Sequence, residues 1–109
     1  MVINKHSGCQ TLSLAKLIDA QEKLSPQVHP PATVAEKLGS EAKDEFWYIV
    51  DAIADAEIYI GLRRGVTRQQ FEAAVESGDA VELVHRIPVK SGNAMLRSSG
   101  RLHTMGGGI

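Results

Sequence analysis

The segment FWYIVDAIADAEIYIGL, residues 46–62, decides the fold class of this 109-residue chain. It contains two short runs, 46–52 and 56–62, that are rich in β-branched and aromatic residues. Runs of this length and composition favour β-strands. Ala54-Asp55 lies between them and predicts a turn. The sequence therefore predicts a β-hairpin at the centre of the chain.

Two further extended stretches precede this segment. Residues 12–19 (LSLAKLID) form a mainly apolar run that suits a strand, with a short helix as the alternative. Residues 24–29 (LSPQVH) favour an extended conformation, and Pro26 restricts this strand to an edge or a bulge. A pair of prolines then opens a short helix over about 32–38, with Gly39 as its C-terminal cap.

On the C-terminal side the apolar spacing changes to that of a helix, and it predicts a helical insertion at about 67–86. Thr67 and Gln70 form a capping-box pattern at its start. A Ser-Gly pair interrupts the helix, and Asp79 with Glu82 predicts the cap of a second short helix.

After the insertion the pattern returns to β. Residues 87–96 contain two β-type stretches around a Ser-Gly-Asn turn, and residues 98–109 are glycine-containing and predict loop. The order of strands, helices and strands predicts a mainly β fold, an antiparallel sandwich or barrel that carries helices. Residues 1–10 are polar and predict a flexible leader, which leaves 11–109 as one domain.

The composition is that of an ordinary globular protein, with 43% hydrophobic and 23% charged residues and a formal net charge of −1. A balanced charge argues against nucleic acid or an anionic membrane surface as the partner, because both need a basic face. No apolar run reaches the roughly 18 residues that a membrane-spanning helix needs. Cys9 is the only cysteine and cannot form an intrachain disulfide. We expect a cytoplasmic protein.

Three separated segments carry side chains that could bind a metal ion. They are Gln27-Val28-His29, Lys43-Asp44-Glu45 and Arg101-Leu102-His103. Residues two apart on a strand point to the same face, so Gln27 and His29 would project together. Two imidazoles, a carboxylate and an amide make a nitrogen and oxygen ligand set that suits zinc or another divalent first-row metal.

Each of these residues can also be interpreted without a metal ion. His29 precedes two prolines and could be an exposed turn residue. Glu45 could be a solvated carboxylate at a strand end. His103 lies in a glycine-containing segment and could belong to a loop.

The same segments carry a resemblance to a known family. Residues 23–30 (KLSPQVHP) and 43–48 (KDEFWY) match two of its motifs, and residues 65–71 match the pattern G-x-T-x-x-x-F. Residues 86–92 match R-x-P-V-x-x-G, and residues 99–106 match S-G-x-x-H-x-x-G. In unbroken order over about residues 11–109, the chain resembles the type I mannose-6-phosphate isomerases, which have the cupin fold. The resemblance implies an incomplete cupin-like jelly roll that covers the central, metal-binding part of the family.

The resemblance also implies roles for individual residues. The zinc ligands would be Gln27, His29, Glu45 and His103. Ser25 and Lys43 match positions that line the sugar-phosphate pocket, and Lys43 is the candidate catalytic residue. The family interconverts mannose 6-phosphate and fructose 6-phosphate by proton transfer between C1 and C2.

The chain departs from the family pattern in several places. Family members are far longer and continue beyond the His103 motif into strands and an arginine-bearing motif that catalysis needs. Arg97-Ser98 replaces an apolar residue and proline, and Pro26 replaces a β-branched residue. Missing strands would leave open sheet edges, so we expect a homodimer, with strand exchange as one route to it.

Three functions remain open at this point. The first is a metal-binding, non-catalytic relative of the isomerases. The second is an active zinc-dependent aldose–ketose isomerase. The third is a structural or interaction module without a metal.

Overall fold

The computed structural model describes residues 2–6, 13–40 and 42–109, with side chains described from residue 15 onward. In chain order the strands are β1 (Val2–His6), β2 (Ser13–Lys16), β3 (Lys43–Tyr48), β4 (Glu57–Leu62), β5 (Val84–Pro88), β6 (Ala94–Arg97) and β7 (His103–Met105). The helical segments are α1 (Ala32–Ala35), η1 (Glu36–Leu38), α2 (Arg68–Ser77) and η2 (Ala80–Leu83).

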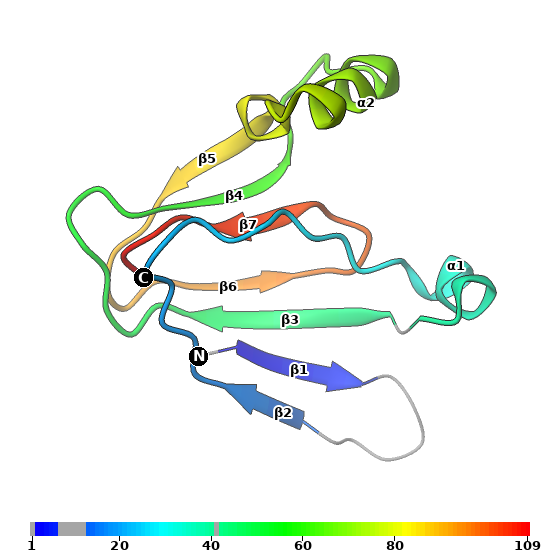
Figure 1. The fold of residues 1–109 in the computed structure, drawn as a ribbon. Helices are drawn as coiled ribbons and strands as arrows, with labels where there is room; N and C mark the ends of the chain where they lie inside the picture. The colour runs from blue at the N-terminus through cyan, green and yellow to red at the C-terminus, as the bar shows by residue number, and fades with distance from the viewer. Residues whose placement is uncertain (1, 7–12, 41) are drawn as a thin grey trace.

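The strands form two sheets, as Figure 1 shows. One sheet has the order β2-β1-β3-β6 and the other has the order β5-β4-β7. Every neighbouring pair is antiparallel. The predicted mainly β, antiparallel fold class is confirmed. Within the described residues the two sheets remain open and do not close into a barrel.

The predicted central hairpin is wrong. The turn at Ala54-Asp55 exists, but β3 and β4 on either side of it belong to different sheets. The two ends of the segment between β3 and β4 explain why the chain passes from one sheet to the other. Ile49 and Ala56 are both 2% exposed and pack in the core between the sheets. Burial of these two apolar residues directs the chain from one sheet to the other.

The core lies between the two sheets. Along β3 burial alternates, so that Glu45 and Trp47 face inward while Phe46 and Tyr48 face outward. The core cluster consists of Ala20, Trp47, Ile49, Ala56, Ile58, Val89 and Met105. The inward face of β3 therefore carries a carboxylate, that of Glu45, next to the apolar core.

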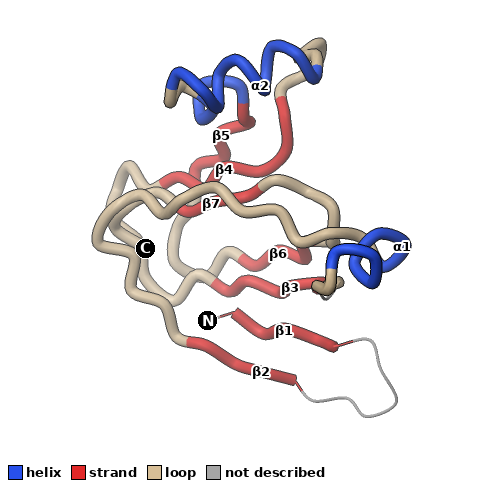
Figure 2. Tube along the Cα trace, turned by 45° about the vertical axis from the view of Figure 1, so that its right-hand side comes forward, coloured by secondary structure: helices blue, strands red, loops and turns tan. Residues whose placement is uncertain are grey.

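The helical insertion follows the prediction at its start and differs at its end. Thr67 and Gln70 form the expected capping box. Asp79 makes no side-chain cap, and its backbone carbonyl accepts from the amide of Glu82 instead. The helices end at Leu83 because Val84–Pro88 pairs with β4 as strand β5, so the predicted range 67–86 is too long. Figure 2 shows these helices at one end of the molecule.

The N-terminal segment pairs with its neighbours. Val2–His6 lies within the predicted flexible leader, and its backbone is paired with β2 on one side and β3 on the other. Val2 and Ile3 are residue types that favour strands. The predicted domain boundary at residue 11 stays a prediction. Cys9 and the rest of residues 7–10 lie outside the described residues.

The predicted extended stretch 24–29 does not form a strand. Its only ladder contact within the described residues is an isolated bridge between Gln27 and His103. The C-terminal segment, predicted as loop, contains β7 and a closely packed glycine run. The Gly106 amide donates to the Glu57 carbonyl at 2.8 Å, and the Gly108 amide donates to the Ala20 carbonyl at 2.7 Å.

Replacing Gly106 with Ala is expected to destabilise the protein by about 1–3 kcal/mol. A Cβ at this position would lie 2.6 Å from the backbone oxygen of Glu57, which the β4 ladder holds in place. Urea-induced unfolding followed by tryptophan fluorescence measures the effect. A Gly106→Ala variant as stable as the wild type would mean that the C-terminal run does not pack against β4.

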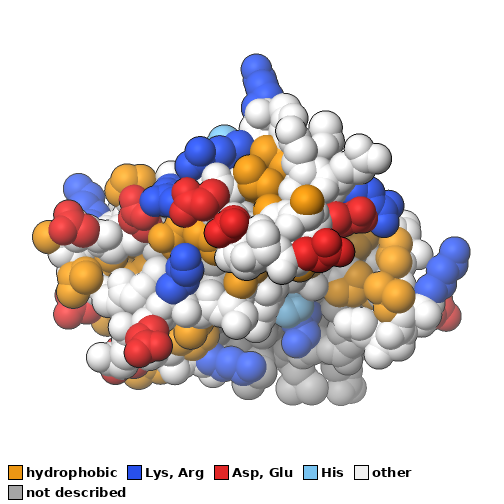
Figure 3. All heavy atoms as spheres, turned by 45° about the horizontal axis from the view of Figure 1, so that its top comes forward, with side chains coloured by type: hydrophobic (Ala, Val, Ile, Leu, Met, Phe, Trp, Pro, Cys, Tyr) orange, Lys and Arg blue, Asp and Glu red, His pale blue; other side chains and the backbone are white. Residues whose placement is uncertain are grey.

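The surface carries charges of both signs. Figure 3 shows Lys and Arg side chains interspersed with Asp and Glu on one face of the molecule. Among the described residues, no helix combines the length and the apolar character needed to span a bilayer.

Candidate metal centre

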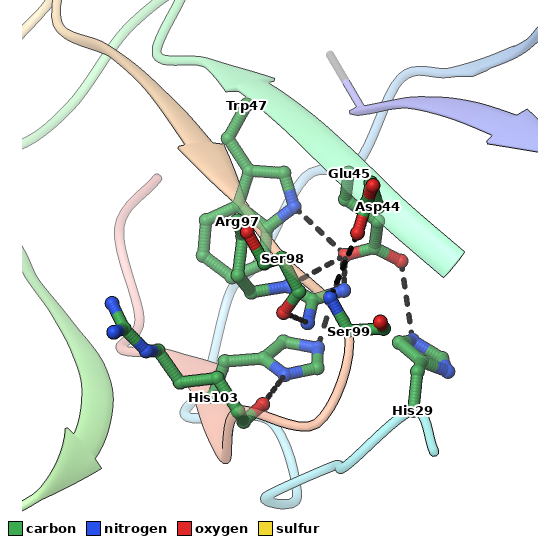
Figure 4. Close-up of polar contacts among 9 residues, drawn as sticks. His29, Asp44, Glu45, Trp47, Arg97, Ser98, Ser99 and His103 are labelled. Atoms are coloured by element: carbon green, nitrogen blue, oxygen red, sulfur yellow. Dashed lines mark hydrogen bonds and ion pairs between the residues drawn. The ribbon is translucent and has the colours of Figure 1, made fainter. Parts of the chain in front are cut away.

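Three segments distant in the sequence bring His29, Glu45 and His103 together (Figure 4). Glu45 projects from the inward face of β3, and His103 begins β7. His29 lies just before α1, and the backbone bridge between Gln27 and His103 holds the segment of His29 beside the start of β7. The Gln27 amide donates to the His103 carbonyl at 2.9 Å, and the His103 amide donates to the Gln27 carbonyl at 2.9 Å.

The potential ligand atoms face one another. His29 Nε2 lies 3.2 Å from Glu45 Oε1, and His103 Nε2 lies 3.8 Å from Glu45 Oε2. One such atom from each of the three residues lies within 4.8 Å of the other two. The side chains of Glu45 and His103 are 9% and 4% exposed, and that of His29 is 22% exposed. The centre is therefore largely buried, with access from the His29 side.

The backbone selects the orientation of the His103 ring. His103 Nδ1 lies 3.0 Å from the backbone carbonyl of Arg101. A carbonyl only accepts, so Nδ1 carries the proton and donates, and the lone pair of the neutral ring is on Nε2. Nε2 is the atom that faces Glu45. Such a second hydrogen bond is typical of metal-binding histidines.

Arg97 and Trp47 complete the surroundings of Glu45. Arg97 lies opposite Glu45 in the β3–β6 register, and its side chain is 0% exposed. Its Nη2 lies 2.8 Å from Glu45 Oε2, and its Nε donates to the same oxygen at 3.2 Å. Trp47 Nε1 also donates to this oxygen at 3.2 Å. Glu45 is thus held by contacts to both of its oxygens.

The charges and the burial shift three pKa values. Burial lowers the pKa of His29 and of His103, and the nearby positive charge of Arg97 lowers both further. For Glu45, burial alone would raise the pKa, but the hydrogen bond and charge of Arg97 hold it below its ordinary value. The folded state therefore favours neutral imidazoles and an ionised carboxylate, which are the forms that bind metal ions.

Acidification is expected to destabilise the metal-free protein. In the folded state the pKa values of His29 and His103 lie below the ordinary value of 6.5, so below pH 6.5 the unfolded chain binds more protons. The stability contributed by the neutral rings is present above pH 6.5 and is lost as the pH falls towards the folded values. Glu45 adds a loss of the same sign below pH 4.5.

Urea unfolding with a chelator present, compared between pH 7.5 and pH 5.5, measures this dependence. His103→Gln is expected to reduce its slope. A stability that rises on acidification over this range would contradict the lowered pKa values of His29 and His103.

A cavity of about 240 Å³ adjoins the centre. His29, Glu45 and His103 line it together with the predicted residues Ser25, Gln27 and Lys43. The six site residues predicted from the sequence thus border one cavity. Their roles as metal ligands or substrate contacts stay predictions.

The residues present fit a divalent first-row metal ion. Two imidazole nitrogens and one carboxylate are a frequent ligand set of zinc sites that keep a further position for water or substrate. The oriented Nε2 of His103 is the observation that supports this fit, because this nitrogen carries the free lone pair and faces the carboxylate of Glu45. Gln27 lines the cavity and could supply an amide oxygen as a fourth donor.

Sequence reasoning missed Arg97 and Trp47 as parts of this centre. The signal for Trp47 was available, since residues 45 and 47 share a face of a strand. Arg97 stood out only as a departure from the family pattern, because its place opposite Glu45 depends on the pairing of β3 with β6.

Comparisons with curated proteins and with solved structures identify relatives of this chain. No family model matches the chain. Mannose-6-phosphate isomerase ManA of Bacillus subtilis (strain 168) is 39% identical over 98 residues, which are 88% of this chain and 31% of that protein. Mannose-6-phosphate isomerase of Streptococcus mutans is 37% identical over 97 residues, with 88% of this chain and 30% of that protein covered.

The fold is also similar to that of a mannose 6-phosphate isomerase. The crystal structure of the mannose 6-phosphate isomerase from Bacillus subtilis superposes with a TM-score of 0.70 at 30% identity, over 81% of this chain and 28% of that one. The chain spans about 30% of the length of the curated relatives it matches. By sequence and by fold, it is a homologue of part of the type I mannose-6-phosphate isomerases.

Proposed function

We propose that this chain binds a divalent metal ion through His29, Glu45 and His103. The observation that carries the proposal is the convergence of these side chains, from three separate segments, on a largely buried point. Structural ion pairs of histidine and glutamate also occur without a metal. Here, however, both Nε2 atoms approach the same carboxylate, and the backbone fixes the tautomer of His103.

Zinc is the ion that this ligand set favours. Imidazole nitrogen suits zinc and its neighbours in the first transition row, whereas magnesium and calcium prefer oxygen ligands. Gln27 is the proposed fourth protein ligand. Equilibrium dialysis against zinc, followed by elemental analysis, tests the proposal. One zinc per chain supports it, and a chain that takes up no zinc would instead be a structural module.

We further propose that the adjoining cavity binds a sugar phosphate. Lys43 lines the cavity and offers an ammonium group to a phosphate, and Ser25 offers a hydroxyl. The relatives are named as isomerases of mannose 6-phosphate, which is a compound of this class. Calorimetric titration with fructose 6-phosphate tests this binding.

Replacing Lys43 with Met is expected to weaken the binding of fructose 6-phosphate by about tenfold or more, because a charge-assisted hydrogen bond is lost. Lys37→Met is the matched control, since Lys37 lies in η1 and does not line the cavity. Equal weakening by both substitutions would show that Lys43 makes no specific contact with the sugar phosphate.

Catalysis of the interconversion of mannose 6-phosphate and fructose 6-phosphate is the second candidate function. The names of the relatives favour it. A bound cation would polarise the sugar carbonyl oxygen. Lys43 would then stabilise the developing oxyanion or donate a proton to it, while one proton is transferred between C1 and C2 of the sugar phosphate. An assay of fructose 6-phosphate formation in saturating zinc tests it: turnover that Lys43→Met abolishes supports it, and no turnover by the folded, zinc-loaded chain contradicts it.

The homodimer and the cytoplasmic location stay predictions. Sedimentation equilibrium tests the first, and cell fractionation tests the second.

A further inference from the structure

Arg97 is a buried cation inside the metal centre that the proposed function does not use. It extends from the edge strand β6, and its guanidinium reaches Glu45 Oε2 through both Nη2 and Nε. Nη1 donates to the backbone carbonyl of Ser98 at 3.3 Å. Nη2 is within ion-pair distance of Glu45, but no acceptor among the described residues is aligned with its N–H groups.

The Glu45 oxygen that Arg97 contacts is the one nearest to His103. Oε2 lies 3.8 Å from His103 Nε2, and it also receives the hydrogen bond of Trp47. A metal ion shared by His103 and Glu45 would therefore lie close to the guanidinium. The positive charges of the metal ion and of the guanidinium would repel each other at close range. Salt would screen this repulsion little, because the side chains are buried.

We propose that Arg97 is a built-in counter-cation of Glu45 that competes with the metal ion and lowers the affinity of the centre for it. This inference rests on the proposed function. In the metal-free state Arg97 compensates the charge of the buried carboxylate. Metal binding must then proceed against the charge of Arg97 or displace the guanidinium from Oε2.

Two substitutions at Arg97 separate the effect of its charge on the affinity for the metal ion from the effect of lost packing. Lys and Met have side chains of similar length, and only Lys is charged. Arg97→Met removes the charge, and Arg97→Lys keeps it. Arg68→Met is the matched control, because it removes an arginine from an exposed i,i+4 pair with Glu72 on α2.

The experiment is a competition titration for zinc against a chromophoric chelator, at fixed pH, with the four proteins. Arg97→Met is expected to bind zinc about 10-fold or more tightly than the wild type, since groups around metal ligands change affinity by about 10–100-fold. Arg97→Lys is expected to stay close to the wild type, and Arg68→Met is expected to equal it.

Each other outcome has a defined meaning. If the wild type binds zinc and Arg97→Met binds it equally or less tightly, the role of Arg97 is overturned while the metal site stands. If neither protein binds zinc, the proposed function itself fails. If Arg97→Met does not fold without metal, Arg97→Gln takes its place, because its amide donates to Glu45 without a charge.

A measurement on the wild type needs no folded variant. The NMR resonance of Arg97 Nε–H is expected to shift on addition of zinc, because its acceptor Oε2 gains a cation. A resonance unchanged at saturating zinc would contradict the proposal that Arg97 and the metal ion compete for Glu45.

Discussion

Replacing Glu45 with Gln is expected to lower the free energy of unfolding of the metal-free protein by about 3–5 kcal/mol. The Arg97 side chain is 0% exposed, and Glu45 is its only charged partner within the described residues. Without the carboxylate, the guanidinium remains as an uncompensated buried charge. Breaking a buried pair by removing one partner is costly for this reason.

Two further variants establish the cause. Glu72→Gln removes one partner of the exposed Arg68–Glu72 pair and is expected to cost only about 0.5 kcal/mol or less. The double variant Glu45→Gln with Arg97→Met is expected to be more stable than Glu45→Gln alone, because no buried charge is left unpaired. Urea unfolding with a chelator present measures all three. A cost for Glu45→Gln as small as that for Glu72→Gln would show that the buried Glu45–Arg97 pair does not stabilise the metal-free fold.

Replacing His103 with Ala is expected to abolish the stabilisation by zinc. A ligand at 100 times its Kd stabilises the native state by about 2.7 kcal/mol, which raises the Tm of a domain of this size by about 10 °C or more. The variant loses the proposed ligand whose ring the Arg101 carbonyl orients. Its Tm is therefore expected to be the same with and without zinc.

His85→Ala is the matched control for this measurement. His85 lies on β5, with an exposed side chain, and it does not line the cavity at the metal centre. The control is expected to keep the full zinc-dependent rise in Tm. A rise retained by His103→Ala would place the stabilising zinc elsewhere on the chain.

Local sequence signals predicted the elements better than their pairing. The capping box at Thr67 and Gln70 formed as expected, because it depends only on residues within one turn. The hairpin around Ala54-Asp55 failed because alternation of apolar residues identifies a strand but not its partner. Partner choice depended on the burial of Ile49 and Ala56 between the two sheets.

The same limit applies to the metal centre. The type and spacing of His29, Glu45 and His103, with the family resemblance, were enough to single these residues out, and the structure brings them together. Arg97 could not be found in this way, because its contact with Glu45 depends on the register of β6 against β3. A long-range register is set by the whole core and not by a local pattern.

Anomalous diffraction at the zinc edge, on crystals grown with zinc, would locate the bound metal ion. One peak is expected within about 2.0–2.2 Å of His29 Nε2, His103 Nε2 and a Glu45 oxygen. A zinc peak elsewhere, with Glu45 still paired to Arg97 and both histidine rings unliganded, would contradict the proposed metal site.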